Sequence, residues 1–129
     1  MIKYGFTKEL DMSFDGAVEA ITAALKKEGF GILTKIDVKE KFKEKLGIDF
    51  RNYVILGACS PAHAHKAIQA EENIGLLLPC NMIVYEKGGK TAVSVIKPSV
   101  AMGSVENESL RPLALEVETL LKRAFDAVV

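Results

Sequence analysis

The residues with the greatest capacity for chemistry lie in two short segments of the chain. The first, Cys59-Ser60-Pro61-Ala62-His63-Ala64-His65, combines a thiol, a hydroxyl and two imidazoles; the second, Leu78-Pro79-Cys80-Asn81, adds a thiol and an amide. We expect the first thiol at the junction of a strand and a helix, where backbone N–H groups and the helix dipole favour a thiolate and bind anions. The candidate ligand-binding residues are therefore Cys59, Ser60, His63, Cys80 and Asn81.

The chain between the two thiols is long enough to bring them together. A helix of about twelve residues carries the chain roughly 18 Å away from the strand end. Residues 73–80 can span up to about 26 Å when extended, so the chain can return to its starting end. Cys80 would then begin a strand antiparallel to the strand that ends at Cys59, and both thiols would lie at one rim of the sheet. Parallel strands would place them at opposite ends.

Histidine spacing limits a metal site. His63 and His65 are two residues apart, about 200° around a helix, so they cannot both face one ion. His63 lies in the first turn and is better placed for a role with Cys59, whereas we expect His65 on the surface. Cys59, His63 and Cys80 would supply three soft ligands for zinc or copper. The chain has no CxxC pair, and free cysteines also serve as small buried apolar residues, so no metal is assigned.

Other catalytic signatures are missing from the sequence. Gly29-Phe30-Gly31 precedes a strand rather than a helix, so it is not a dinucleotide fingerprint. There is no phosphate-binding lysine loop and no Gly-x-Ser-x-Gly motif. Ser60 has no evident acid and base partners in the sequence. No catalytic residue or cofactor is therefore assigned.

Hydrophobic periodicity and capping residues predict the elements that position these segments. Tyr4–Leu10 suits an edge strand, and Ser13 caps an amphipathic helix that ends before Gly29. Phe30–Val38 alternates as a strand does. Asp37 and Glu40 have the spacing of a capping box for a short helix that ends at Gly47.

The second half of the chain continues the same mixture of strands and helices. Tyr53–Cys59 is a continuous apolar run, which predicts a central strand covered on both faces. Ser60-Pro61 begins a helix that runs to about Glu72, followed by an apolar connector. Cys80–Lys87 and Lys90–Lys97 flank Gly88-Gly89 as a hairpin. The last helix carries Leu110, Leu113, Val117, Leu120, Leu121 and Ala124 on one side, with Pro112 in its first turn.

This order predicts one α+β domain over residues 1–129. We expect a mainly antiparallel sheet of about five strands, with helices packed on one face, in the order β-α-β-(α)-β-α-β-β-α. In the hairpin, Met82, Val84, Val93 and Val95 share one face, and Ile83, Tyr85, Ala92 and Ile96 share the other. Both faces are apolar, but the helices can cover only one. An exposed apolar face is typical of an interface, so we expect a homodimer; another helix of the same chain is the alternative cover.

Composition excludes several classes of protein. The chain has 129 residues, of which 17 are Lys or Arg and 17 are Asp or Glu, giving a net charge of zero. This balance argues against nucleic acid or anionic lipid as a partner. The apolar stretches are too short to cross a membrane, and no signal peptide is evident. Two cysteines are too few for a disulfide scaffold, so we expect a cytoplasmic protein.

Several stretches resemble one bacterial and archaeal family. They are Gly29–Thr34, Ile36–Val38, Lys45–Phe50, Tyr53–Pro61, Ala67–Ala70 and above all Ile74–Asn81. Together they are similar to domain of unknown function 302 (DUF302) over nearly the whole chain. The resemblance implies a curved antiparallel sheet under helices, of the TATA-binding-protein-like class, and a homodimer. It implies no activity. Ser60 stands where the family's first cysteine motif usually has Asn, and either residue can cap a helix.

Three functions remain open from the sequence. The leading hypothesis is a cytoplasmic homodimer that binds a small ligand or a soft metal at the Cys59/Cys80 rim. The second is a thiol-dependent redox or transfer enzyme with Cys59 as nucleophile, His63 as base and Cys80 as resolving thiol. The third is a structural or interaction protein in which the cysteines are core residues.

Overall fold

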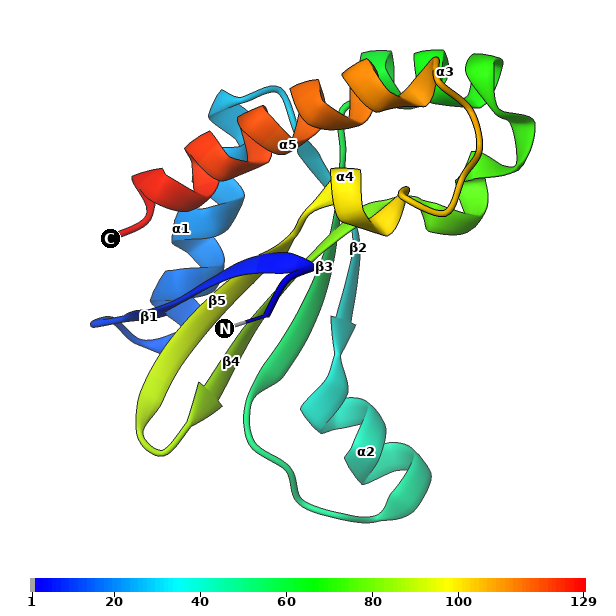
Figure 1. Cartoon of the computed structure of the whole chain (residues 1–129). Coiled ribbons are helices and arrows are strands. Elements are labelled where there is room, and N and C mark those ends of the chain that lie inside the picture. The colour runs from blue at the N-terminus through cyan, green and yellow to red at the C-terminus, as the bar shows by residue number, and fades with distance from the viewer. Residues whose placement is uncertain (1) are drawn as a thin grey trace.

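A computed structural model describes residues 2–129 as a five-stranded sheet with long helices on one face (Figure 1). The elements, in chain order, are β1 (Gly5–Leu10), α1 (Phe14–Lys27), β2 (Gly31–Asp37), α2 (Val38–Leu46), β3 (Tyr53–Cys59), α3 (Pro61–Ala70), the 3-10 helix η1 (Glu72–Leu77), β4 (Cys80–Lys87), β5 (Lys90–Ile96), α4 (Pro98–Ala101) and α5 (Leu110–Ala127).

All neighbouring strands of the sheet are antiparallel, in the order β1-β5-β4-β3-β2. β1 is therefore an edge strand and β3 is an interior strand, as predicted. The turn between β4 and β5 uses Gly88 at φ 59° and Gly89 at φ 76°. A two-residue hairpin of this hand needs positive φ at both positions, which glycine adopts without strain. The predicted α+β class is confirmed.

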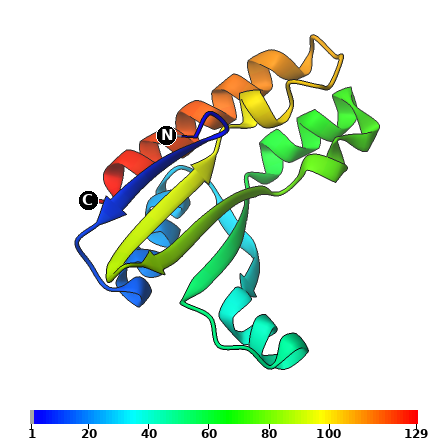
Figure 2. The ribbon, with the colours of Figure 1, turned by 60° about the horizontal axis from the view of Figure 1, so that its bottom comes forward.

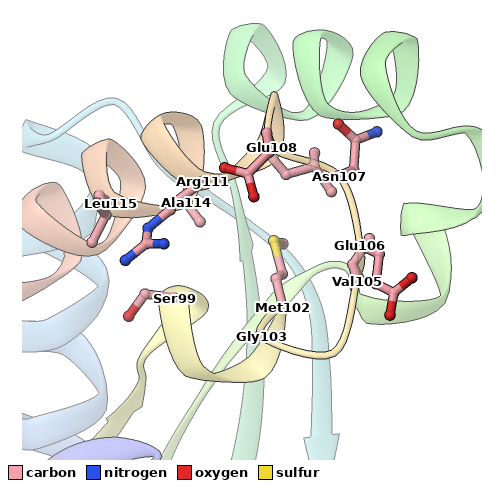
Figure 3. A pocket seen from close by; sticks show the side chains of 11 residues that line it. Ser99, Met102, Gly103, Val105, Glu106, Asn107, Glu108, Arg111, Ala114 and Leu115 are labelled. Atoms are coloured by element: carbon pink, nitrogen blue, oxygen red, sulfur yellow. The ribbon is translucent and has the colours of Figure 1, made fainter.

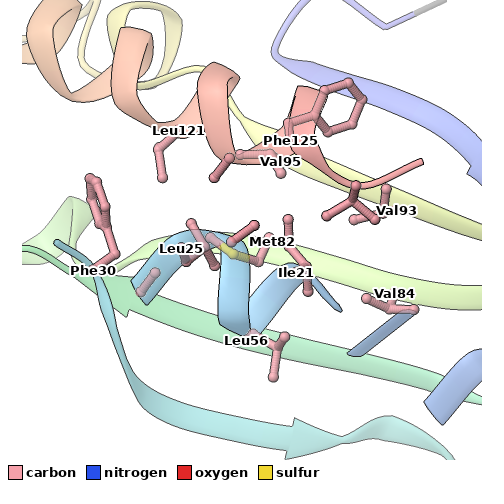
Figure 4. Close-up of a cluster of buried hydrophobic side chains, with 14 of the residues drawn as sticks. Ile21, Leu25, Phe30, Leu56, Met82, Val84, Val93, Val95, Leu121 and Phe125 are labelled. Carbon is pink, nitrogen blue, oxygen red and sulfur yellow. The ribbon is translucent and has the colours of Figure 1, made fainter. Parts of the chain in front are cut away.

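The main core lies between the sheet and helices α1 and α5. Figure 4 shows Ile21 and Leu25 of α1 and Leu121 of α5 meeting the strand residues Met82 and Val93. All five of these side chains are at most 1% exposed. The hairpin residues predicted to share one face, which also include Val84 and Val95, belong to this core. Burial of this many apolar side chains is the dominant stabilising contribution in a domain of this size.

The opposite face of the sheet is open in the monomer. Figure 2 shows this face, with α1 and α5 behind the strands. Tyr53 and Tyr85 stack across β3 and β4 with ring centroids 5.6 Å apart, and Ile55 pairs with Ile83 beside them. These four side chains are only partly buried. The predicted cover on both faces of β3 is therefore wrong within residues 2–129, because the helices pack on one face alone.

Local capping explains the start of α1 and both ends of α2. The Ser13 side chain accepts a hydrogen bond from the Gly16 N–H, and the Asp37 carboxylate accepts one from Glu40 N–H, each at 3.0 Å. Gly47 ends α2 in the left-handed region at φ 67°. Pro112 lies in the first turn of α5, as predicted.

Three details differ from the sequence prediction. α3 ends at Ala70 rather than near Glu72, and the expected connector contains the 3-10 helix η1. The short helix α4, whose first residue Pro98 follows β5 closely, was not predicted. Within residues 2–129, no helix combines the length and hydrophobicity needed to cross a bilayer.

Candidate functional site

Both thiols lie at the same rim of the sheet, where β3 ends and β4 begins. The two strands are antiparallel, as expected, and Ala58 pairs with Cys80. Cys59 is one residue further along β3, so strand alternation directs its side chain to the face opposite that of Cys80. Cys80 packs in the helix-covered core with Ala58. Asn81 pairs with Gly57 and lies exposed on the same, open face as Cys59.

The buried position of Cys80 makes its thiol unreactive at neutral pH. Its side chain is 8% exposed. Burial, with a smaller contribution from the nearby Cys59, raises the pKa of Cys80 to about 11. Because the thiolate is the nucleophile and the metal ligand, a thiol that stays protonated is a poor candidate for either role. The cysteines are both free, Cys59 being partly buried.

The structure does not assemble the metal site considered from the sequence. In the part of the chain that the structure describes, no three His, Cys, Asp or Glu side chains are placed to hold one metal ion. The candidate group of Cys59, His63 and Cys80 is therefore not formed. The physical reason is the register: consecutive strand positions direct the two sulfurs to opposite faces.

His63 instead joins two other side chains in a hydrogen-bonded chain. Its Nδ1 lies 2.7 Å from the Ser60 hydroxyl, and its Nε2 lies 3.0 Å from a carboxylate oxygen of Glu116 on α5. In the neutral tautomer protonated on Nε2, the imidazole donates to Glu116 and accepts from Ser60. The sequence does not indicate that Glu116 is the acid of this group, because Glu116 is 53 residues from His63 and occupies an exposed position of α5.

These hydrogen bonds connect α3 to α5, and Ser60 does not cap α3 with its side chain. Ser60 makes no side-chain hydrogen bond to the first backbone N–H groups of α3. The hydrogen bond from His63 lowers the pKa of the Glu116 carboxyl, and the charges of a protonated His63 and of Lys66 add to the effect. The Glu116 side chain is 62% exposed, so water screens the pair and the bond positions the helices more than it polarises the hydroxyl.

A cavity of about 710 Å³ lies between α4 and the N-terminal part of α5 (Figure 3). Volumes of this size are typical of small-molecule sites. It is bounded by α4, by the loop of residues 102–109 and by the first two turns of α5. The lining residues are Ser99, Met102, Gly103, Val105, Glu106, Asn107, Glu108, Leu110, Arg111, Ala114 and Leu115.

The cavity combines apolar walls with charged groups that have no partner. Within residues 2–129, none of the charged lining residues Arg111, Glu106 and Glu108 takes part in an ion pair. In Figure 3 the Arg111 guanidinium points toward the α4 side, the Glu108 carboxylate lies at the loop, and the Met102 side chain extends from the end of α4 toward α5. A cation, carboxylates and an apolar surface are groups that can orient a small polar ligand.

Hydrogen bonds connect the elements that surround the cavity. Glu118 of α5 accepts hydrogen bonds from the backbone N–H of Ser99, at 3.0 Å, and from its hydroxyl. The Asn107 amide donates to the Ala70 carbonyl at 2.8 Å and to the Glu71 carboxylate at 3.0 Å. The loop is thus fixed to α3 and α4 to α5. Sequence patterns do not reveal this site, because the loop of residues 102–109 follows no helix or strand period.

Comparison with known proteins settles the family of the chain. The family model described as domain of unknown function DUF302 matches residues 6–128. The chain belongs to the DUF302 family. A solved structure, described as an uncharacterized conserved protein DUF302 from Bacillus stearothermophilus, has a TM-score of 0.92 and 30% sequence identity, covering 99% of this chain and 100% of that one. The search of curated proteins gives no match. The expected resemblance to DUF302 is confirmed.

Proposed function

We propose that this DUF302 protein is a small-molecule binding protein that acts as a homodimer, with its ligand in the cavity between α4 and α5. One observation carries the proposal: a volume of about 710 Å³ has apolar walls and three charged side chains, Arg111, Glu106 and Glu108, without ion-pair partners in residues 2–129. Charged groups left unpaired beside an apolar surface favour a ligand that supplies the missing partners.

The thiol rim is the weaker candidate for the ligand. Cys80 is buried and its pKa is raised to about 11, which disfavours it as a resolving thiol or soft ligand. Cys59 and Asn81 lie toward the open face, whereas Ser60 bonds to His63, which bonds to Glu116 of α5. Binding at the Cys59/Cys80 rim would therefore engage only part of the predicted set.

The open face of the sheet supports the homodimer. Tyr53, Tyr85, Ile55 and Ile83 form a continuous apolar group at its centre. Thr7 and Ser94 bond to each other at 2.7 Å toward the β1 edge, so polar side chains border the group. An apolar centre with a polar border is typical of a protein interface, and a second copy is the commonest partner. The proposed location remains the cytoplasm, where both free thiols would stay reduced.

Saturation-transfer NMR with a library of small carboxylates, amines, zwitterions and neutral aromatics tests the binding function. We expect at least one compound to receive saturation from the wild-type protein. Leu115→Trp, which fills the cavity from a partly exposed wall position, should abolish the signal. The control Leu76→Trp, at a position 88% exposed and outside the cavity, should retain it. A library without binders, or equal signals in both variants, would contradict the proposal.

A further inference from the structure

We infer that the cavity between α4 and α5 is a site for a zwitterion with an apolar tail, such as an α-amino acid with a bulky aliphatic side chain. This inference rests on the proposed binding function and names the class of ligand. It follows from the signs of the charged side chains that line the cavity and from the apolar surface beside them.

The first step is the sign of the charges. The cavity lining includes one guanidinium, that of Arg111, and two carboxylates, those of Glu106 and Glu108. Among the described residues, none of the three takes part in an ion pair. Unpaired charges of both signs in one cavity match a ligand that itself carries both signs.

The second step is the pairing of groups. A guanidinium binds a carboxylate through two parallel hydrogen bonds, so Arg111 is the partner for the ligand's carboxylate. A carboxylate accepts hydrogen bonds from an ammonium group, so Glu108, with Glu106 in the same lining, is the partner for the ligand's amine. An α-amino acid carries a carboxylate and an amine, so it can meet charges of both signs.

The third step is the apolar wall. Met102, Val105 and Leu115 line the cavity, and Leu115 is 47% exposed. An aliphatic side chain placed against them would remove apolar surface from water on both partners. Methionine is flexible and accommodates side chains of different shape, so the site would accept several aliphatic residues rather than one.

Isothermal titration calorimetry with three compounds tests the inference. L-leucine carries both charges, 4-methylpentanoate carries only the carboxylate, and 3-methylbutylamine carries only the amine. We expect leucine to bind at least about tenfold more tightly than either analogue, because each lost charge-assisted hydrogen bond weakens binding by about that factor. Arg111→Gln should weaken leucine and 4-methylpentanoate binding, and Glu108→Gln should weaken leucine and 3-methylbutylamine binding. Arg51→Gln and Glu72→Gln, outside the cavity, should change nothing.

The outcomes separate this inference from the proposed function. If either analogue binds as tightly as leucine, the zwitterion is the wrong ligand class, while binding in the cavity stands. If none of the three binds but another library compound gives a signal that Leu115→Trp abolishes, the zwitterion is again wrong and the binding function stands. If no library compound binds, both are overturned.

Discussion

The core under the sheet and the cavity beside α4 are built on the same helix but differ in how its side chains are used. In its C-terminal half, α5 contributes Leu121 and Phe125 to the core, where they are 0% and 6% exposed. In its N-terminal half, Arg111 and Leu115 face a cavity and stay exposed. The C-terminal half of the helix therefore packs into the main core, whereas the N-terminal half buries Leu110 and Ala114 and also presents exposed side chains to the cavity.

The largest loss of stability is expected for a fully buried residue of the main core. Leu121→Ala should lower the free energy of unfolding by about 2–5 kcal/mol, because it leaves a void among side chains that cannot relax into it. Leu115→Ala, on the cavity side of the same helix, should cost about 0.5 kcal/mol or less. Urea unfolding of both variants measures the comparison. Equal losses would show that the cavity wall is packed as the core is.

The buried thiol of the core predicts a loss of stability at alkaline pH. The pKa of Cys80 is raised from 9.0 to about 11, so between these values the folded state binds a proton that the unfolded state has released. Stability is then complete below pH 9 and falls as the pH rises toward 11, by roughly 2–3 kcal/mol. Denaturant titrations from pH 8 to 11 should show the fall, and Cys80→Ala should reduce it. An identical slope in Cys80→Ala would remove Cys80 as its cause.

The two faces of the sheet offer a second contrast. Ile83→Lys, on the open face, should convert the dimer to a monomer while changing the stability of the monomer by about 1 kcal/mol or less. Sedimentation velocity at micromolar concentration measures the association. Ile68→Lys is the matched control, since Ile68 is 46% exposed on α3 and lies outside the sheet. A wild-type monomer, or a dimer in Ile83→Lys, would contradict the proposed interface.

The smallest effect is expected at the exposed contact between α3 and α5. His63→Ala removes the hydrogen bond that lowers the pKa of Glu116 below its ordinary value of 4.5. A carboxyl with a lowered pKa stabilises the fold above that ordinary value and loses the effect as the pH falls through its folded pKa. In His63→Ala the carbon-13 titration of the Glu116 carboxyl should move upward. An unchanged titration would show that the bond is absent in solution.

The sequence was informative where residue patterns repeat. Ser13, Asp37 and Gly47 act locally, and the apolar periods of α1 and α5 follow directly from burial on one side, so these elements could be predicted. The rim shared by the two thiols also followed from chain lengths. Which face each sulfur occupies did not, because that depends on a register set by pairing across strands.

The functional candidates depended on contacts between distant parts of the chain. Ser60-Pro61 marked the start of α3 correctly, but the Ser60 hydroxyl bonds to His63, which Glu116 holds from another helix. The cavity is built from residues 99–115, whose loop has no period to detect. Its unpaired Arg111 is visible only once the neighbours of that side chain are known.

Methyl NMR of protein labelled with carbon-13 at the methionine methyl groups tests the central claim most directly. Met102 lines the cavity and Met82 lies in the core, where it is 1% exposed, so one spectrum reports on both regions. On titration with L-leucine, the account predicts a saturable shift of the Met102 methyl resonance and an unchanged Met82 resonance. A Met102 resonance that does not move, or that moves only together with Met82, would contradict binding of a zwitterion in the cavity.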